Sequence, residues 1–251
     1  MTIRRLVAAA ISILVTASAA HAAACAFETQ DDGHVIEVID GRSFRLSDGR
    51  EIRLAGIELI APKDTGALAA LVKDKDVSLH GPDDTPDRYG RQTAFVFVAG
   101  SDISVQAQLL AQGAALASPD VTDKDCAAAL MAVEADARAA KKGTWAATNV
   151  IKNAESADDI LAGIGRFVLV EGRVLSVRQA GTMTYLNFGR NWTRDFAATI
   201  ARRMMPAVEV AGFTLKSLEN RRIRVRGWVE AHPGPRIEVV RAGQIEVLSG
   251  K

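Results

Sequence analysis

Apolar and polar residues alternate over several short stretches after residue 33, as they do in strands with one buried face. Turn formers separate these stretches, and Ser47-Asp48-Gly49 is typical of a hairpin. Apolar residues at helical spacing predict helices over 103–113 and 126–143, each ended by a glycine, and a shorter one within 64–76. The sequence therefore predicts a mainly β unit with packed helices, whose strands cover residues 34–38, 43–46, 51–54, 77–79 and 93–100.

A polar stretch at residues 149–163 breaks this pattern and reads as a linker. Beyond it the alternation predicts five more strands, with a helical segment between the third and the fourth. That order is typical of an OB-fold, a small barrel that often binds oligonucleotides or sugars. These strands are expected over residues 167–177, 184–188, 196–200, 223–230 and 236–240.

The first 22 residues have the features of a secretory signal peptide. Arg4 and Arg5 precede an apolar run that is too short and wrongly flanked for a stable membrane span, and Ala20-His21-Ala22 is a small-residue cleavage site. We therefore expect an exported protein, periplasmic or secreted, without a transmembrane segment after signal removal. The expected parts are a signal peptide (1–22), an N-terminal domain (23–148), a linker (149–163) and an OB-like β-barrel domain (164–251).

Cys25 and Cys126 are the only cysteines. In an oxidising compartment they predict a disulfide, with two unrelated buried thiols as the alternative. Lipid anchoring at Cys25 is a weaker expectation, because the bulky apolar residue usual three positions earlier is missing. Two cysteines without an adjacent histidine do not build a zinc site.

The two halves of the mature chain carry opposite net charges. Residues 23–150 hold 13 basic and 20 acidic side chains, and residues 151–251 hold 16 basic and 10 acidic ones. This asymmetry predicts two modules, the second with affinity for anions. The alternative is that the two halves pair with each other electrostatically.

Several motifs in the first half occur in a recognisable order. They are Asp40-Gly41 in a strand turn, Arg53-Leu54-Ala55-Gly56-Ile57-Glu58, the loop Asp87-Arg88-Tyr89-Gly90-Arg91, the helix at 103–113 and the closing stretch 140–145. Together they resemble the staphylococcal nuclease (thermonuclease) family over about residues 34–146. The resemblance implies an OB-like barrel with packed helices, and calcium-dependent cleavage of DNA and RNA.

The resemblance also assigns roles to individual residues. Arg53 and Arg91 match the two catalytic arginines of the family, and Glu58 stands where the family has a calcium-binding aspartate. Phosphodiester hydrolysis adds charge at the transition state, which a hard cation with oxygen ligands neutralises. Arginine holds phosphate oxygens bidentately, where lysine would be a looser point charge.

Two departures from the family pattern argue against this chemistry. The family turn has a calcium-binding aspartate where this chain has Arg42, and two like charges about 4 Å apart repel by roughly 4 kcal/mol at an effective dielectric of 20. The family has a Pro-Glu pair that supplies the proposed base, whereas Lys63 follows Pro62 here. Losing a general base typically costs about 10²–10⁴ in rate.

We therefore expect no cofactor, and a cationic pocket of Arg42, Arg53, Arg91 and Lys63 that binds phosphate. The alternatives are that Arg42 is a solvated turn residue and that Arg53 pairs with Glu58 or Asp40. Asp40 itself is expected to form the turn rather than to bind a metal.

The second module offers aromatic and arginine side chains. Tyr185 and Trp192 lie around a turn with interleaved arginines, and Arg222, Arg224 and Arg226 alternate along one strand. Such a mixture suits base stacking with phosphate contacts. The alternative is a barrel strand with an exposed charged face and aromatics in the core.

These observations favour an exported thermonuclease-family protein that is catalytically degenerate and binds nucleic acid or another polyanion. One alternative is an active metal-dependent phosphodiesterase, with calcium held by Glu58 and Asp64 as base. A second alternative is a cell-envelope scaffold with a protein or glycan partner.

Overall fold

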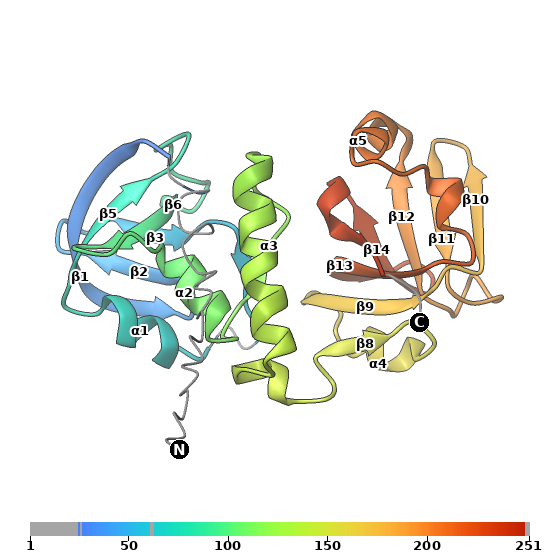
Figure 1. The fold of residues 1–251 in the computed structure, drawn as a ribbon, viewed down its shortest axis with the longest axis horizontal. Coiled ribbons are helices and arrows are strands. Elements are labelled where there is room, and N and C mark those ends of the chain that lie inside the picture. Colours follow the sequence, from blue (N-terminus) through green and yellow to red (C-terminus); the bar gives the residue numbers. More distant parts are fainter. Residues whose placement is uncertain (1–24, 26, 61–62, 249–251) are drawn as a thin grey trace, which may run out of the picture.

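The computed structural model describes residue 25, residues 27–60 and residues 63–248. They form two domains on either side of a long helix, α3 (Lys124–Ala139) (Figure 1). The mainly β class with helices is confirmed. No helix in these ranges is long and apolar enough to cross a membrane. The signal peptide expected over 1–22 lies outside the described residues.

Five strands close the barrel of the N-terminal domain in the order β1-β2-β3-β6-β5. β3 and β6 run parallel, and the other neighbours run antiparallel. Alternate side chains fill the core, and Phe44, Leu46 and Ile52 are fully buried. All the strands expected in this half are present, as β1 (Thr29–Asp40), β2 (Ser43–Leu46), β3 (Glu51–Leu54), β5 (Asp76–His80) and β6 (Arg91–Val98).

The expected helices pack on this barrel. Ser104 and Asp123 cap two of them by accepting hydrogen bonds from the backbone N–H groups of Ala107 and Cys126. Gly113 has φ +71°, and a Cβ there would lie 2.1 Å from the Lys142 carbonyl oxygen, so this helix stop requires glycine. The remaining elements are α1 (Gly66–Val72), α2 (Val105–Ala111) and η1 (Gly143–Ala146), with the short pair β4 (Ile57–Glu58) and β7 (Leu116–Ala117).

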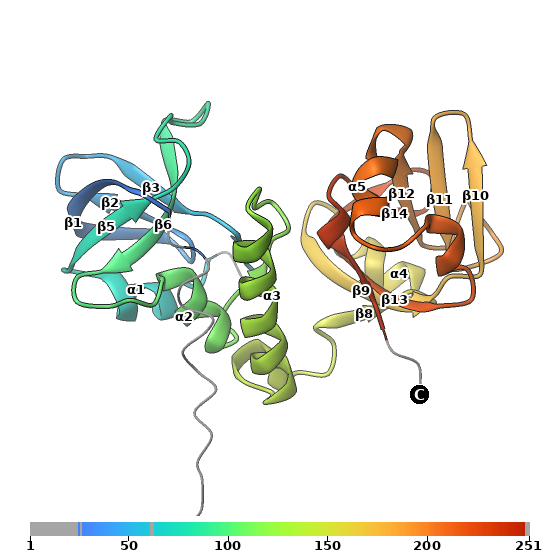
Figure 2. The same cartoon turned by 45° about the horizontal axis from the view of Figure 1, so that its top comes forward.

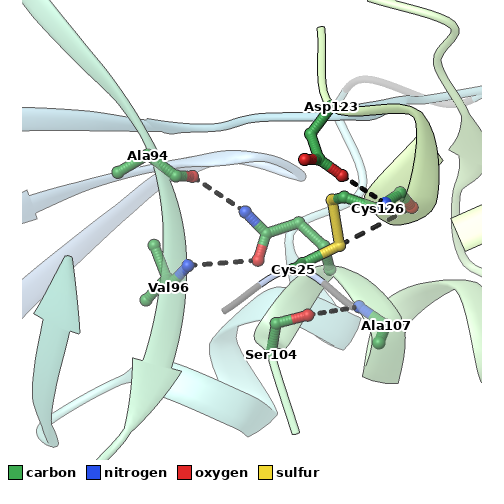
Figure 3. The surroundings of a disulfide bond; sticks show 8 residues. Cys25, Ala94, Val96, Ser104, Ala107, Asp123 and Cys126 are labelled. Atoms are coloured by element: carbon green, nitrogen blue, oxygen red, sulfur yellow. Dashed lines mark hydrogen bonds between the residues drawn. A yellow bond between two sulfur atoms is a disulfide. The ribbon is translucent and has the colours of Figure 1, made fainter. Parts of the chain in front are cut away.

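The expected disulfide between Cys25 and Cys126 is confirmed, with Cα atoms 4.6 Å apart (Figure 3). It ties the start of the described chain to the first turn of α3, across 101 positions of sequence. Because its sulfur is bonded to Cys126, Cys25 has no free thiol for lipid attachment. Gln106 on α2 fixes this helix to β6, because its side chain donates to the Ala94 carbonyl and accepts from the Val96 N–H.

The C-terminal domain contains one eight-stranded sheet with the path β10-β11-β12-β14-β13-β9-β8, from which β15 pairs with β13. All five expected strands occur, but the stretch 167–177 divides between β9 and β10, and β8 and β15 were not expected. The predicted five-stranded second barrel is therefore not confirmed. The strands are β8 (Ile151–Asn153), β9 (Phe167–Arg173), β10 (Ser176–Ala180), β11 (Met183–Asn187), β12 (Ala197–Ala201), β13 (Arg222–Ala231), β14 (Pro235–Val239) and β15 (Ile245–Val247).

The stretch expected as a linker, 149–163, is part of this second domain. Within it, β8 pairs in parallel with β9, and Ile160 of α4 (Ala157–Leu161) is buried in the core. The helical segment expected between β12 and β13 is present. It comprises η2 (Arg202–Met204), α5 (Met205–Val210) and η3 (Leu215–Leu218), and η4 (Ala242–Gln244) follows later in the chain.

The two domains lie on either side of α3 (Figure 2), and an apolar contact joins them. Leu116, Ala137 and Trp145 of the first domain form one buried cluster with Phe167 and Leu169 of the second. Burying such side chains stabilises the contact by about 25 cal/mol per Å² of apolar surface. The domains are therefore packed against each other rather than joined by a free linker.

Candidate functional site

The turn between β1 and β2 directs Arg42 into the protein. Asp40 Oδ1 accepts a hydrogen bond from the Arg42 backbone N–H at 2.8 Å, so Asp40 is the expected turn former. Gly41 is required at this point, because a Cβ there would lie 2.6 Å from the carbonyl oxygen of Asp64. Arg42 is only 8% exposed, so the alternative of a solvated turn residue is wrong.

Arg42 forms a buried ion pair with Glu58. Its Nη1 lies 2.6 Å from Glu58 Oε2 and donates to the Ile57 carbonyl oxygen at 2.7 Å. Burial raises the pKa of Glu58 above its ordinary value, Arg42 opposes that rise, and the nearby charge of Asp120 adds to it. The pairing with Glu58 that the sequence allowed for Arg53 is therefore made by Arg42.

The surroundings of Glu58 do not fit a calcium ion. Calcium takes six to eight oxygen ligands, whereas here the Glu58 carboxylate bonds a guanidinium group. Within residues 25, 27–60 and 63–248, no group of three or more His, Cys, Asp or Glu side chains could hold a metal ion. We therefore assign Glu58 as the ion-pair partner of Arg42 and not as a metal ligand.

Arg53 and Arg91 lie on neighbouring parallel strands. The register of β3 and β6 pairs Glu51 with Arg91 and Arg53 with Thr93. Because paired residues and residues two positions apart share a face, Arg53 and Arg91 project from the same side, opposite to the buried Ile52. The fold thus brings together the two arginines that the resemblance selects.

The two arginines differ in their partners. Arg91 donates to Asp87 Oδ2 from Nη2 at 2.8 Å and from Nε at 3.1 Å, and this hydrogen bonding lowers the pKa of Asp87 to about 2. The guanidinium of Arg91 also lies 4.9 Å from the centre of the Tyr89 ring. Arg53 makes no ion pair within the part of the chain that the structure describes. Arg53 can therefore bind an anion directly, whereas Arg91 must first break its hydrogen bonds to Asp87.

Lys63 is exposed and also makes no ion pair among the described residues. Its neighbour Asp64, the base considered for an active enzyme, accepts a hydrogen bond from the Gly66 N–H at 3.1 Å. Because the Asp64 carbonyl packs on Gly41, this segment runs beside the turn that carries Arg42. Lys63 thus adds positive charge near the turn.

The sequence did not single out Ser43. Its side chain is 1% exposed, and its hydroxyl has no hydrogen-bond partner among the described residues. Ser43 pairs with Arg53 across β2 and β3. Burying a hydroxyl without a hydrogen-bond partner costs about 1–3 kcal/mol. Nothing in the described residues compensates this cost at Ser43, which lies beside Arg53.

The arginine row on β13 does not form an accessible surface. Arg226 is 1% exposed and Arg224 is 8% exposed, so neither contacts nucleic acid as predicted. Arg224 bonds Glu171 and Glu246 of its own domain. Alternation along the strand places these arginines on one face, but it cannot show that the first domain covers that face.

Of the other candidates in this domain, Arg222 is exposed and lies 3.4 Å from Glu171. Tyr185 is half-buried on β11. Trp192 is 73% exposed in the connection between β11 and β12, so its ring is not part of the core.

Among the described residues, three charged contacts join the two domains. The sequence predicted that the two halves could pair electrostatically, but it did not identify these residues. Arg226 bonds Glu134 of α3, Arg241 Nη2 lies 3.2 Å from Asp120 Oδ1, and Arg138 is 3.9 Å from Glu246. Two of these contacts join an acidic side chain of the first half to an arginine of the second, whereas Arg138 and Glu246 pair in the opposite sense. The alternative that the charge asymmetry serves pairing between the halves therefore explains part of it.

One comparison with known proteins bears on these observations. Residues 61–147 match the family model described as staphylococcal nuclease homologue. This confirms the resemblance for a segment that includes Arg91, α2 and α3, and we call residues 27–147 the nuclease-like domain. Arg42, Arg53 and Glu58 precede the matched segment, so their comparison with the family rests on the motifs and on strand register. No curated protein matches the chain significantly.

Proposed function

We propose that the nuclease-like domain binds the phosphodiester backbone of a nucleic acid without metal-dependent cleavage. The observation that carries this proposal is the buried pair of Arg42 and Glu58. It puts a cation and its own carboxylate partner where the family has two acidic calcium ligands. A metal entering there would have to break a buried ion pair and then stay close to a guanidinium group.

Binding itself is supported by Arg53 and Arg91. They share one face of the barrel, on neighbouring parallel strands. Guanidinium groups bind phosphate oxygens through paired hydrogen bonds, which makes two neighbouring arginines suited to a backbone phosphate. Lys63 adds long-range attraction at the edge of the site.

The binding experiment compares Arg53→Ala/Arg91→Ala with wild type on single-stranded DNA at several salt concentrations. We expect the double variant to bind more weakly and with a smaller salt dependence, because each lost contact with a single-strand phosphate lowers the slope by about 0.7. Lys73→Ala/Lys142→Ala is the matched control, since it removes the same charge from exposed positions beyond the ends of α1 and α3. Equal binding by wild type and the double variant would exclude this site.

The cleavage experiment measures DNA hydrolysis with calcium and with a chelator. We expect no calcium-dependent cleavage by wild type. Arg42→Asp/Lys63→Glu restores both departing positions to the family's residue types, so any cleavage should appear in that variant. Calcium-dependent cleavage by wild type that is lost in Arg91→Ala would instead support the active phosphodiesterase.

We also propose that the protein is exported. The disulfide between Cys25 and Cys126 is consistent with an oxidising compartment. The test is the mass of the protein recovered from the periplasm and the medium of the producing cells. A mature N-terminus after Ala22 is expected, and a full-length chain retained with reduced cysteines would contradict export.

A further inference from the structure

The surface on the β10–β14 side of the C-terminal domain carries a second set of unassigned groups. Strand register places Arg178, Tyr185, Thr199 and Glu238 in one row across β10, β11, β12 and β14. The neighbouring row contains the buried Leu186 and faces the core, so this row lies on the opposite face of the sheet. There Arg178 is exposed and Tyr185 and Glu238 are half-buried, whereas Thr199 is covered. β10 and β11 lie on the side of the domain away from α3 in both views (Figures 1 and 2).

Two buried polar atoms on this face have no partner among the described residues. They are the Thr199 hydroxyl and Arg236 Nε. Thr199 is fully buried, and Arg236 uses Nη2 to bond Glu230 at 2.7 Å. Buried polar groups are normally hydrogen-bonded, so these two atoms are exceptions. Because neither atom is accessible, a ligand at this face would contact its exposed side chains instead.

The connection between β11 and β12 extends this face with a rigid loop, residues 189–195. Asp195 accepts a hydrogen bond from the Asn191 N–H at 2.7 Å, and Asn191 accepts from the N–H and hydroxyl of Thr193. At its base the rings of Phe188 and Phe196 pack with centroids 5.0 Å apart. The loop is therefore held in shape before any ligand arrives.

This loop displays an aromatic ring between two cations. Trp192 is 73% exposed, and Arg190 and Arg194 are exposed and make no ion pair among the described residues. The Asp195 carboxylate points to the loop backbone and does not neutralise them. Leaving an indole and two guanidinium groups uncovered does nothing for folding, because none of them packs in the core.

We propose that the loop 189–195 and the adjoining side chains of Arg178 on β10 and Tyr185 on β11 bind single-stranded nucleic acid. Trp192 and Tyr185 offer stacking surfaces for unpaired bases, and Arg190, Arg194 and Arg178 reach the phosphates. Single strands fit better than duplexes, because stacking on an exposed indole needs a free base face. An anionic lipid surface fits less well, because Asn191 and Thr193 flank the ring with polar groups.

The test uses a labelled oligo(dT) of about 15 nucleotides, which is long enough to span the loop and the adjoining strands. It is performed on the full mature chain carrying Arg53→Ala/Arg91→Ala. In this background, oligonucleotide bound at the nuclease-like domain does not mask binding at the loop, and the result does not depend on whether the proposed function is correct. In that background we expect Trp192→Ala to weaken binding at least about fivefold, the equivalent of one lost stacking contact. Trp192→Phe should recover part of the affinity.

Charge is tested separately. Arg190→Ala/Arg194→Ala should lower the slope of log affinity against log salt by about 1.4, for two phosphates of a single strand. Arg166→Ala/Arg173→Ala removes the same charge from exposed positions beside and at the end of β9, and it should leave oligonucleotide binding nearly unchanged. Quenching of tryptophan fluorescence by the oligonucleotide should disappear with Trp192.

Three outcomes would overturn the inference. One is unchanged oligo(dT) binding in a folded Trp192→Ala variant. Another is equal dependence on Trp192 for duplex and single strand. The third is Trp192-dependent binding to vesicles of anionic phospholipid without binding to the oligonucleotide, which would assign the loop to a membrane surface instead.

Discussion

Arg226 of β13 and Glu134 of α3 form a bidentate ion pair between the two domains. Arg226 Nη1 lies 2.9 Å from Glu134 Oε2, and Nη2 lies 3.0 Å from Oε1, across 92 positions of sequence. Arg226 also donates to the Ala117 carbonyl oxygen, and Glu134 accepts from the Ala117 N–H. Both side chains are almost completely buried. Separating the two domains would therefore break a buried ion pair and leave each of its charges without a partner.

Glu134→Gln should destabilise the whole protein. It leaves the guanidinium of Arg226 buried without its counter-charge, and breaking such a pair costs about 3–5 kcal/mol. Urea unfolding should show this loss, and the single transition should separate into two as the domains uncouple. Arg226→Met/Glu134→Leu should recover only part of the stability. It removes both charges of the pair, but it leaves Arg138 and the backbone groups of Ala117 without these partners.

The control for this prediction is Glu230→Gln. Glu230 pairs with Arg236 at 2.7 Å but is 49% exposed, so its loss should change the free energy of unfolding by less than about 1 kcal/mol. A loss of similar size in both variants would mean that burial of the interdomain pair has no special effect.

The strands of the barrel could be predicted because local pattern decides them. Alternation of apolar residues and the turn formers between strands are local features, and so are the caps at Ser104 and Asp123. The disulfide followed from a count of two cysteines and an expected compartment. Partners of charged side chains could not be predicted in this way, because they depend on contacts between distant segments.

Arg226 and Arg42 illustrate that limit. The period of β13 correctly put Arg224 and Arg226 on one face, but their exposure depended on whether α3 covers it. At Arg42 the resemblance to the nuclease family implies a cation in place of an acidic ligand, which stays a prediction. It did not reveal that Glu58, the other candidate ligand, is the partner of this cation.

Arg42→Met should make stability depend more strongly on pH. Burial already raises the pKa of Glu58, so protonation of Glu58 favours the folded state, and this contribution is lost as pH rises through the folded-state pKa. Removing Arg42 raises that pKa further. The loss of stability should therefore be largest at pH 7, about 3–5 kcal/mol, and smaller near pH 5, where Glu58 takes up a proton more readily.

Urea unfolding of wild type and Arg42→Met at both pH values checks this prediction. Arg45→Met is the control, because Arg45 lies two residues beyond Ser43 on the same strand and its side chain is 41% exposed. If the difference between wild type and Arg42→Met were the same at both pH values, Glu58 would not be the group that senses the loss.

Asp87→Asn should strengthen the binding of phosphate groups at Arg91. The hydrogen bonds from Arg91 keep the pKa of Asp87 at about 2, so the carboxylate remains ionised near neutral pH and competes with any phosphate. Because this pKa is lowered on folding, the stabilisation from the pair is present above the ordinary pKa of Asp87 and is lost only as pH falls toward 2. Acidification to pH 5 should therefore not release Arg91, whereas the substitution should.

An asparagine at position 87 keeps the turn and removes only the charge. Asp87 Oδ1 accepts the N–H groups of Tyr89 and Arg91, and an amide oxygen can accept both. A solvent-screened ion pair of this kind competes only weakly, so the affinity for single-stranded DNA should rise by no more than about fivefold. Asp83→Asn is the matched control, since Asp83 lies in the same loop but bonds the Thr85 N–H. If both variants gained equally, the effect would be one of net charge, and Arg91 would have no particular part in it.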